Sequence, residues 1–172
     1  MNKCVFLDRD GVLNQDLEGY LFQPELIQFP DGVKGGLLRL KKAGYLLIVI
    51  TNQAGIAKSL YTSSEVIDVH SRMNEEYGGV LDDLYFAPHH DAHTTRSLSR
   101  KPGSLMIERA MAKYNIDPAG SWMIGDHERD IEAGIKAGVQ TILIGKAGEH
   151  TKAAFKVSCF QEAVAAILEN AG

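Results

Sequence analysis

Short apolar runs alternate with amphipathic segments along this chain, and the alternation predicts its fold. The first run, Cys4 to Leu7, is apolar at every position, which is typical of a strand buried on both faces of a parallel sheet. Similar runs recur at residues 45–50, 80–86, 122–124 and 139–144. Helical segments follow them at about residues 31–43, 62–77, 104–114, 131–137 and 160–168. This order predicts an α/β fold with a doubly wound parallel sheet of about five or six strands.

Polar residues and glycines mark several of the expected helix ends. We expect Asp31 to cap the first helix at its N-terminus and Gly44 to end it. Thr62 stands three residues before Glu65, the spacing of a capping box at the start of the second helix. The apolar stripe expected for the first helix comprises Val33, Leu37, Leu38 and Leu40.

The composition limits the classes of protein to be considered. A chain of 172 residues with 45% hydrophobic content is long enough for one well-packed domain, which we place at residues 1–172. Its formal net charge of −4 argues against nucleic acid or an anionic membrane as a partner. No apolar run approaches the ~20 residues that span a bilayer, and the residues before the first strand lack a secretory segment. We therefore expect a cytoplasmic protein, and we favour a monomer.

Two carboxylates follow the first strand directly. Asp8 and Asp10 stand one residue apart and are followed by Gly11, at the carboxyl end of a strand, where ligands bind in open α/β sheets. Two acids so close together repel each other unless a cation is present, and Mg²⁺ prefers oxygen ligands. An ordinary Asp-Gly turn would account for Asp10 and Gly11 but not for Asp8.

Polar groups also stand at the ends of three later strands. Thr51, Asn52 and Gln53 follow the second strand, where hydroxyl, amide and backbone groups can donate hydrogen bonds to a phosphate. Arg100 and Lys101 precede the third helix. A further pair of acids, Asp126 and Asp130, follows the fourth strand with helical spacing.

Together these motifs resemble those of the haloacid dehalogenase (HAD) superfamily phosphatases. The resemblance spans nearly the whole chain. It implies that Asp8 is the nucleophile that accepts the phosphoryl group, and that Asp10 protonates the leaving oxygen and then activates water. It also implies that Thr51 and Lys101 bind the phosphoryl oxygens.

The same resemblance implies a Mg²⁺ site. Its ligands would be Asp8, the main-chain carbonyl of Asp10 and Asp126. Asp130 is a candidate for a supporting position behind these ligands, although an acid in the first turn of a helix also favours the helix dipole. No insertion of domain size separates the motifs, so we expect a capless member of the superfamily.

The sequence TNQAGI and the Arg-Lys pair resemble a narrower group, the histidinol-phosphate and heptose-bisphosphate phosphatases. That group implies a flap at residues 14–30 and a specificity loop at residues 87–100. Long loops of this kind are usually functional. The substrate-binding residues that we expect are Asn52, Gln53, Arg100, Asp16, Gly19 and His127.

This chain departs from its heptose-bisphosphate relatives in the specificity loop. Those relatives commonly hold a structural zinc ion there, and the corresponding positions in this chain are Ala87, His89, Ser97 and Ser99. Without thiolates the tetrahedral site cannot form, so we expect no zinc. We also assign no metal to the neighbouring histidines, His90 and His93.

The leading hypothesis is therefore a Mg²⁺-dependent phosphomonoester hydrolase that forms an aspartyl-phosphate. Its substrate would be a small phosphorylated metabolite, first of all D-glycero-D-manno-heptose 1,7-bisphosphate, which would lose its 7-phosphate. Histidinol phosphate is the nearest alternative, and another small metabolite stays open. The net negative charge of the chain argues against a polynucleotide 3′-phosphatase. A module that binds a phosphate ligand without catalysis is the hypothesis from a different class.

Overall fold

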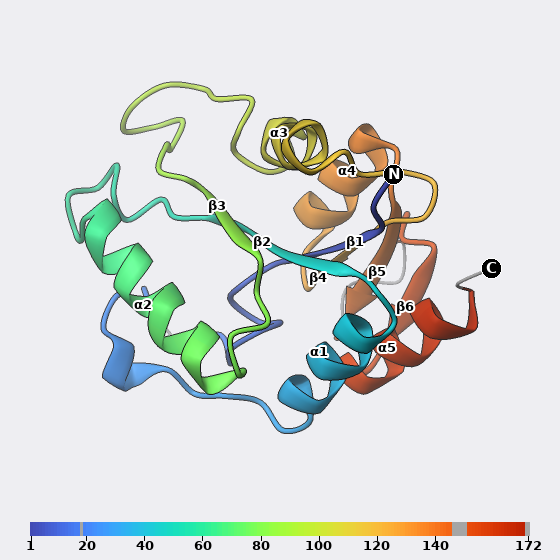
Figure 1. The fold of residues 1–172 in the computed structure, drawn as a ribbon. Helices are drawn as coiled ribbons and strands as arrows, with labels where there is room; N and C mark the ends of the chain where they lie inside the picture. Colours follow the sequence, from blue (N-terminus) through green and yellow to red (C-terminus); the bar gives the residue numbers. More distant parts are fainter. Residues whose placement is uncertain (18, 146–150, 171–172) are drawn as a thin grey trace.

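A six-stranded parallel sheet lies at the centre of the computed structural model, which describes residues 1–17, 19–145 and 151–170 (Figure 1). The strand order is β3-β2-β1-β4-β5-β6. The chain fills the sheet outward from β1 in both directions, so β1 lies at the point where the strand order reverses. A crevice forms outside the carboxyl ends of the strands at such a point. The strands are β1 (Cys4–Leu7), β2 (Leu46–Asn52), β3 (Asp83–Ala87), β4 (Trp122–Gly125), β5 (Gln140–Ile144) and β6 (Phe155–Val157).

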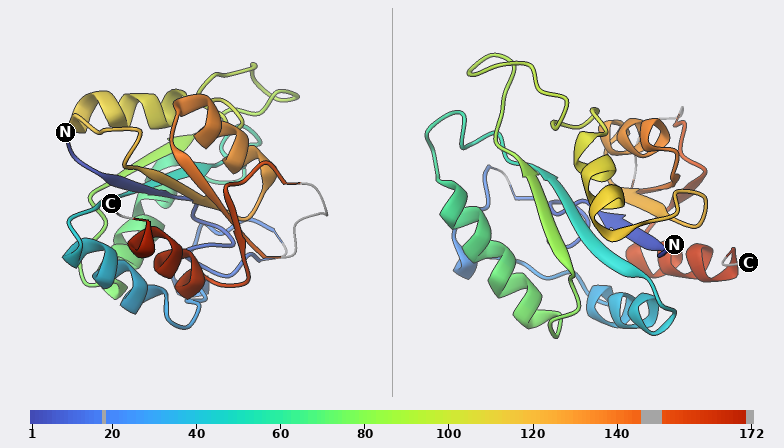
Figure 2. Two further views of the ribbon diagram at one scale, coloured as in Figure 1. Left: turned by 90° about the vertical axis from the view of Figure 1, so that its right-hand side faces the viewer. Right: turned by 45° about the horizontal axis from the view of Figure 1, so that its top comes forward.

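Helices cover both faces of the sheet, as Figure 1 and Figure 2 show. One face packs against α1 (Val33–Lys42), α2 (Ser63–Glu76) and α5 (Phe160–Glu169). The other face packs against α3 (Leu105–Tyr114) and α4 (Glu128–Ala137). The side chains of β1 alternate between these two cores and are fully buried in both, which explains why this strand is apolar at every position.

Two details of α1 differ from the sequence prediction. The residue at its N-cap is Gly32 rather than Asp31, and Gly32 adopts φ 80°, a left-handed conformation that glycine allows at little cost. Leu38 is not part of the buried stripe, because it is 46% exposed. At the helical repeat, Val33, Leu37 and Leu40 already share the inward face, and Leu38 points away from it.

Other element boundaries also differ from the prediction. Helix α2 begins at the capping box of Thr62 and Glu65, as expected. Helix α4, however, begins at Glu128, three residues before the apolar pattern indicates, so Asp130 lies in its first turn. Strand β3 begins at Asp83 rather than at residue 80. The short strand β6 was not among the apolar runs identified in the sequence.

The flap contains no hairpin in its described part, residues 14–17 and 19–30. It contains one short 3₁₀-helix, η1 (Pro24–Leu26), beside α2. The segment that follows the last apolar run, residues 145–150, which the sequence indicates to be a loop, lies outside the described residues except for Gly145. Among the helices that the structure describes, none has the length and apolar character needed to cross a membrane.

Candidate active site

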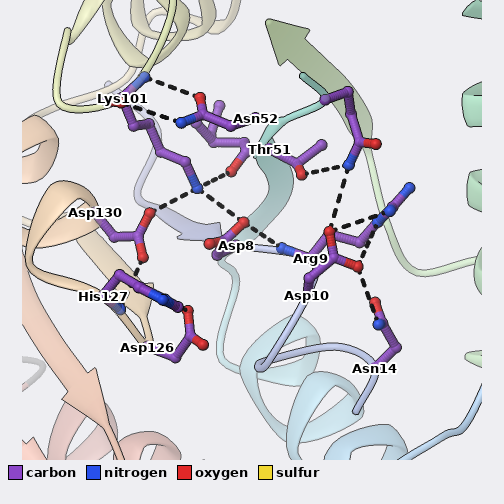
Figure 3. A network of polar contacts seen from close by, with 12 residues as sticks. Asp8, Arg9, Asp10, Asn14, Thr51, Asn52, Lys101, Asp126, His127 and Asp130 are labelled. Carbon is purple, nitrogen blue, oxygen red and sulfur yellow. Dashed lines mark hydrogen bonds and ion pairs between the residues drawn. The ribbon is translucent and has the colours of Figure 1, made fainter. Parts of the chain in front are cut away.

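The motifs of four strand ends meet at one buried cluster of charges (Figure 3). Lys101, which precedes α3, extends its ammonium group between Asp8 and Asp130. The Nζ atom lies 2.8 Å from Asp8 Oδ1 and 2.7 Å from Asp130 Oδ1, and it donates a hydrogen bond of 2.8 Å to the carbonyl of Ile50. The ammonium group thus makes two ion pairs and one hydrogen bond. The cluster joins β1, β2, α3 and α4 at the crevice.

The charges in this cluster do not balance. Two buried carboxylates, Asp8 and Asp130, share one buried ammonium. Burial, together with the nearby charge of Asp130, raises the pKa of Asp8 to about 8, although Lys101 acts in the opposite direction. Burial alone would lower the pKa of Lys101, but Asp130 and Asp8 outweigh it and raise that pKa. Lys101 therefore stays positively charged, and the cluster favours a further cation.

Asn52 holds the backbone of Lys101 in place. Its Oδ1 accepts a hydrogen bond of 2.9 Å from the Lys101 backbone N–H, and its Nδ2 donates one of 3.1 Å to the Lys101 carbonyl. The end of β2 is thereby tied to the segment before α3. Both ends of the Asn52 amide are engaged in this contact, so its observed role is to position Lys101. Its contact with substrate stays a prediction.

The Asp10 carboxylate is oriented by four donors from three side chains. Arg9 contributes Nε and Nη2, each at 3.1 Å, Asn14 contributes Nδ2 at 3.1 Å, and Gln53 contributes Nε2 at 3.4 Å. Arg9 is almost fully buried, and its Nη2 also donates to the carbonyl of Leu21 in the flap. Asp10 itself keeps 32% of its side chain exposed. It is therefore fixed in direction yet accessible from the crevice.

Asp126 lies against the turn that carries Asp10. A Cβ atom at Gly11 would lie only 2.1 Å from Asp126 Oδ2, so a glycine is needed there for the carboxylate to fit. The other oxygen, Oδ1, is 2.7 Å from Nδ1 of His127. Burial raises the pKa of Asp126. The Asp126 carboxylate thus lies beside Gly11, the residue that follows Asp10.

These residues fit a magnesium ion. Carboxylates of Asp8 and Asp126 and the backbone at Asp10 offer oxygen donors, which a hard cation prefers. Burial first, and then the charge of Asp130, raises the pKa of both carboxyl groups, and a cation bound between them would act in the opposite direction. Donor atoms of Asp126, His127 and Asp130 also lie within 4.8 Å of one another. That group includes the ring nitrogen of His127, which is already engaged with Asp126 Oδ1, whereas the first set offers oxygen donors alone and is therefore the better magnesium site.

The remaining predicted residues lie around this centre. Thr51 is buried, and its Oγ1 accepts a hydrogen bond of 2.9 Å from Gln53. Arg100 lines a cavity of about 530 Å³ at the base of the specificity loop. In the flap, Asp16 and Gly19 are exposed, and neither contacts the polar network among the residues that the structure describes.

Hydrogen bonds organise the specificity loop. The hydroxyls of Ser97 and Ser99 lie 2.7 Å apart, and Arg100 donates a bond of 3.2 Å to the carbonyl of His89. The backbone N–H of His90 donates to Thr94 Oγ1 at 3.0 Å. Of the four positions that correspond to zinc ligands in the heptose-bisphosphate relatives, three are occupied by His89, Ser97 and Ser99. The two hydroxyls that stand where thiolates are missing thus bond to each other.

Sequence reasoning missed two residues of the site, Arg9 and Asn14. Arg9 offered one signal, because an arginine between two aspartates at the end of a buried strand is placed to pair with one of them. Asn14 offered none, since a turn asparagine is ordinary.

Several known proteins are similar to this chain in sequence and in fold. A family model described as HAD-hydrolase-like matches residues 98–170. The D-glycero-beta-D-manno-heptose-1,7-bisphosphate 7-phosphatase of Haemophilus ducreyi is 39% identical over 155 residues, which cover 86% of this chain and 85% of the relative. The chain belongs to the HAD-like phosphatases. The resemblance and the α/β fold inferred from the sequence are confirmed.

Other HAD-like phosphatases show how close the match is. The D-glycero-alpha-D-manno-heptose-1,7-bisphosphate 7-phosphatase of Burkholderia mallei is 39% identical over 151 residues, covering 83% of this chain and 79% of the relative. A crystal structure of D,D-heptose 1,7-bisphosphate phosphatase from B. bronchiseptica, complexed with magnesium and phosphate, superimposes with a TM-score of 0.87 at 25% identity. The superposition covers 97% of this chain and 98% of the B. bronchiseptica chain. The relatives thus include enzymes named for both anomers.

Proposed function

We propose that this phosphatase removes the 7-phosphate from D-glycero-D-manno-heptose 1,7-bisphosphate through an aspartyl-phosphate on Asp8. The observation that carries the proposal is the buried contact of Asp8 with Lys101 at the sheet's switch point. This contact supports the proposed roles of Asp8 as nucleophile and of Lys101 as the phosphate-binding cation, because both side chains would meet the same phosphoryl group. The names of the relatives supply the substrate hypothesis. Histidinol phosphate stays the nearest alternative.

In the first step, Asp8 would attack the phosphorus atom in line with the sugar oxygen. The bond between Asp8 and phosphorus forms as the bond to the sugar breaks, and Asp10 protonates the departing oxygen. Thr51 and Lys101 would bind the oxygens of the transferring group. Mg²⁺ bound by Asp8, the Asp10 carbonyl and Asp126 would supply the positive charge that lets a carboxylate approach a phosphate.

In the second step, water would hydrolyse the aspartyl-phosphate. Asp10, now a carboxylate, takes a proton from the water as its oxygen attacks phosphorus, and the bond to Asp8 breaks. The four donors around Asp10 hold it in one direction for both proton transfers. Free phosphate and the original enzyme result.

Substrate recognition is assigned to the residues around this centre. Arg100 and the specificity loop border the cavity where the rest of the sugar would lie. Asn52, Gln53, Asp16, Gly19 and His127 complete the proposed set. We further propose one capless domain that acts in the cytoplasm as a monomer, on a small metabolite and without a nucleic-acid partner.

A kinetic panel tests the proposed substrate. Phosphate release is measured with Mg²⁺ on both anomers of the heptose bisphosphate, histidinol phosphate, fructose 1,6-bisphosphate and a 3′-phosphorylated oligonucleotide, with Asp8→Asn as the blank. We expect kcat/KM for one heptose anomer to exceed the others by about 100-fold, or about 2.7 kcal/mol. Equal, slow turnover of every compound would overturn the heptose assignment. Absence of any hydrolysis would favour a binding module.

Chelators test the proposed metals. EDTA should abolish activity, and added Mg²⁺ should restore it. A zinc-selective chelator should leave activity unchanged, because hydrogen bonds order the specificity loop. Loss of activity with the zinc-selective chelator, recovered by zinc alone, would contradict the zinc-free assignment.

A further inference from the structure

Tyr61 connects the flap to the polar network of the active site. It lies between the end of β2 and the start of α2, and only 5% of it is exposed. Its hydroxyl donates a hydrogen bond of 2.7 Å to Oε1 of Gln53. On the other end of the same amide, Nε2 of Gln53 donates to Thr51 Oγ1 at 2.9 Å and to Asp10 Oδ2 at 3.4 Å. One side chain therefore links Tyr61 to both proposed catalytic groups.

The two ends of the Gln53 amide are chemically different, so its orientation matters. A carboxylate such as Asp10 only accepts hydrogen bonds and therefore requires the NH₂ end. If the amide turned over, its oxygen would face the Asp10 carboxylate and repel it. Burial raises the pKa of Tyr61 to about 12, so its hydroxyl stays protonated and able to donate. The Tyr61 hydroxyl thereby selects the orientation in which NH₂ faces Asp10.

The ring of Tyr61 is held by the flap and by the turn beneath it. Phe22 stacks on it at a centroid distance of 5.5 Å, and Tyr20 packs against it at 5.7 Å. Gly55 also lies against the ring, because a Cβ atom there would be 2.0 Å from it, so glycine is required at this position. Contacts with the flap and with Gly55 therefore restrict the ring and the direction of its hydroxyl.

Arg9 provides a second link from the flap to the same carboxylate. Its Nη2 bonds both Asp10 and the carbonyl of Leu21, the residue between the two flap aromatics. Residues 20–22 of the flap are therefore joined to Asp10 through Arg9 on one route and through Tyr61 and Gln53 on the other. Flap position and Asp10 orientation depend on each other.

We propose that Tyr61 is a positioning residue, which holds the Gln53 amide so that Asp10 is aimed for proton transfer when residues 20–22 are seated on its ring. This inference rests on the proposed role of Asp10 as the acid and base. It assigns to Tyr61 no contact with substrate. An effect that acts through Thr51 should be the same for every leaving group, so only the part that acts through Asp10 should depend on the leaving group.

The test compares two leaving groups. An alkyl phosphate needs protonation of its oxygen, whereas p-nitrophenyl phosphate releases a stable anion without it. Because kcat/KM reports steps up to the first irreversible one, it isolates departure of the leaving group. Tyr61→Phe keeps the ring and removes only the hydroxyl. We expect kcat/KM to fall about tenfold with heptose 1,7-bisphosphate and less than about threefold with p-nitrophenyl phosphate.

A second variant and a control complete the experiment. Gln53→Met should give the same leaving-group dependence, and the double variant should be no worse than Gln53→Met alone. Tyr114→Phe removes the hydrogen bond that the hydroxyl of Tyr114, at the end of α3, donates to Asp83 in β3, and it should change kcat/KM for neither substrate. Glycerol 3-phosphate serves as the alkyl phosphate if the wild type does not hydrolyse the heptose compound.

The outcomes separate this inference from the proposed function. Equal losses on both phosphates, no loss on either, or additive effects in the double variant would overturn the role of Tyr61. Failure of the wild-type enzyme to release phosphate above the Asp8→Asn blank would instead overturn the proposed function, and the role of Tyr61 would fall with it. Leaving-group dependence in Tyr61→Phe and Gln53→Met, with Tyr114→Phe unchanged, supports the proposal.

Discussion

Asp8 is a residue whose placement costs stability in the absence of a cation. It is buried beside Asp130, with Lys101 as their shared positive partner. Removing the only partner of a buried charge usually destabilises a protein. Neutralising the second of two buried carboxylates that share one ammonium should instead stabilise it. Asp8→Asn keeps the size of the side chain and leaves Lys101 paired with Asp130. The site is therefore arranged for an added cation rather than for stability alone.

We predict that Asp8→Asn abolishes hydrolysis and stabilises the metal-free protein at pH 8 by about 1–4 kcal/mol. The folded-state pKa of Asp8, about 8, lies above its unfolded value of ~4, so the native wild type holds the extra proton between these values. Wild-type stability should therefore fall as pH rises through this window, and the advantage of the variant should vanish near pH 4. Thermal unfolding across pH 4–8.5 checks this. A constant difference at every pH would contradict it.

Gly11 is required by what lies next to it as well as by its backbone. It adopts φ 82°, and a Cβ atom there would meet Asp126 Oδ2 at 2.1 Å. Gly78 has the same φ of 82°, but nothing lies within 4 Å of its Cβ position. Gly78→Ala therefore reproduces the backbone strain without the collision.

We predict that both glycine-to-alanine variants lose about 1–2 kcal/mol of stability from the left-handed backbone. Only Gly11→Ala should also lose activity, by roughly 100-fold, because the displaced Asp126 shifts the proposed metal site. Its half-saturating Mg²⁺ concentration should rise. Denaturant unfolding and Mg²⁺ titration of activity measure the two effects. Equal activities in the two variants would show that the contact with Asp126 has no role in catalysis.

At the scale of elements, the site depends on ties between strand ends and the segments that follow. Helix α4 begins early enough to place Asp130 under Lys101, and the end of β2 holds the Lys101 backbone through Asn52. Asn74 makes the same double contact with the backbone of Leu81, at 2.9 and 3.4 Å, but away from the site. The two asparagines thus form a matched pair.

We predict that Asn52→Asp and Asn74→Asp each lose about 1–3 kcal/mol of stability, because a carboxylate cannot donate to the carbonyl it faces. Activity should fall about tenfold or more only in Asn52→Asp, since Lys101 then moves relative to Asp8. Chemical unfolding and kcat/KM for each variant provide the comparison. An Asn52→Asp enzyme as active as Asn74→Asp would rule out this positioning role.

Elements differ in how well the sequence predicts them, for physical reasons. Buried strands such as β1 and β2 are apolar at nearly every position and are evident in the sequence. Strand β6 is three residues long, with Lys156 at its centre, and gives no such signal. The flap has no repeating pattern, so its 3₁₀-helix and its contacts with Tyr61 depend on tertiary packing.

At the scale of the whole molecule, the order of the strands explains why the site could be predicted. The sheet grows outward from β1, so the ends of β1, β2 and β4 meet at the crevice, where Thr51 lies near the end of β2 and Asp8 and Asp126 directly follow β1 and β4. Residues of this kind could be identified from the sequence, because each belongs to a motif that stands at the end of a buried strand. Asn14 and Tyr61 could not, because their roles arise from contacts that the sequence pattern does not indicate. The overall charge of −4 likewise conceals the local cluster around Lys101.

The central claim is that phosphate passes through Asp8, and trapping that intermediate tests it most directly. Asp10→Asn should slow hydrolysis of the aspartyl-phosphate while a good leaving group still departs. After acetyl phosphate and Mg²⁺ are mixed with this variant and quenched in acid, mass spectrometry should find one phosphoryl group, on the peptide that contains Asp8. It should be absent from the variant that also carries Asp8→Asn. Phosphate release by the wild type with no phosphorylated Asp8 peptide in Asp10→Asn, or with the label on another residue, would contradict the mechanism.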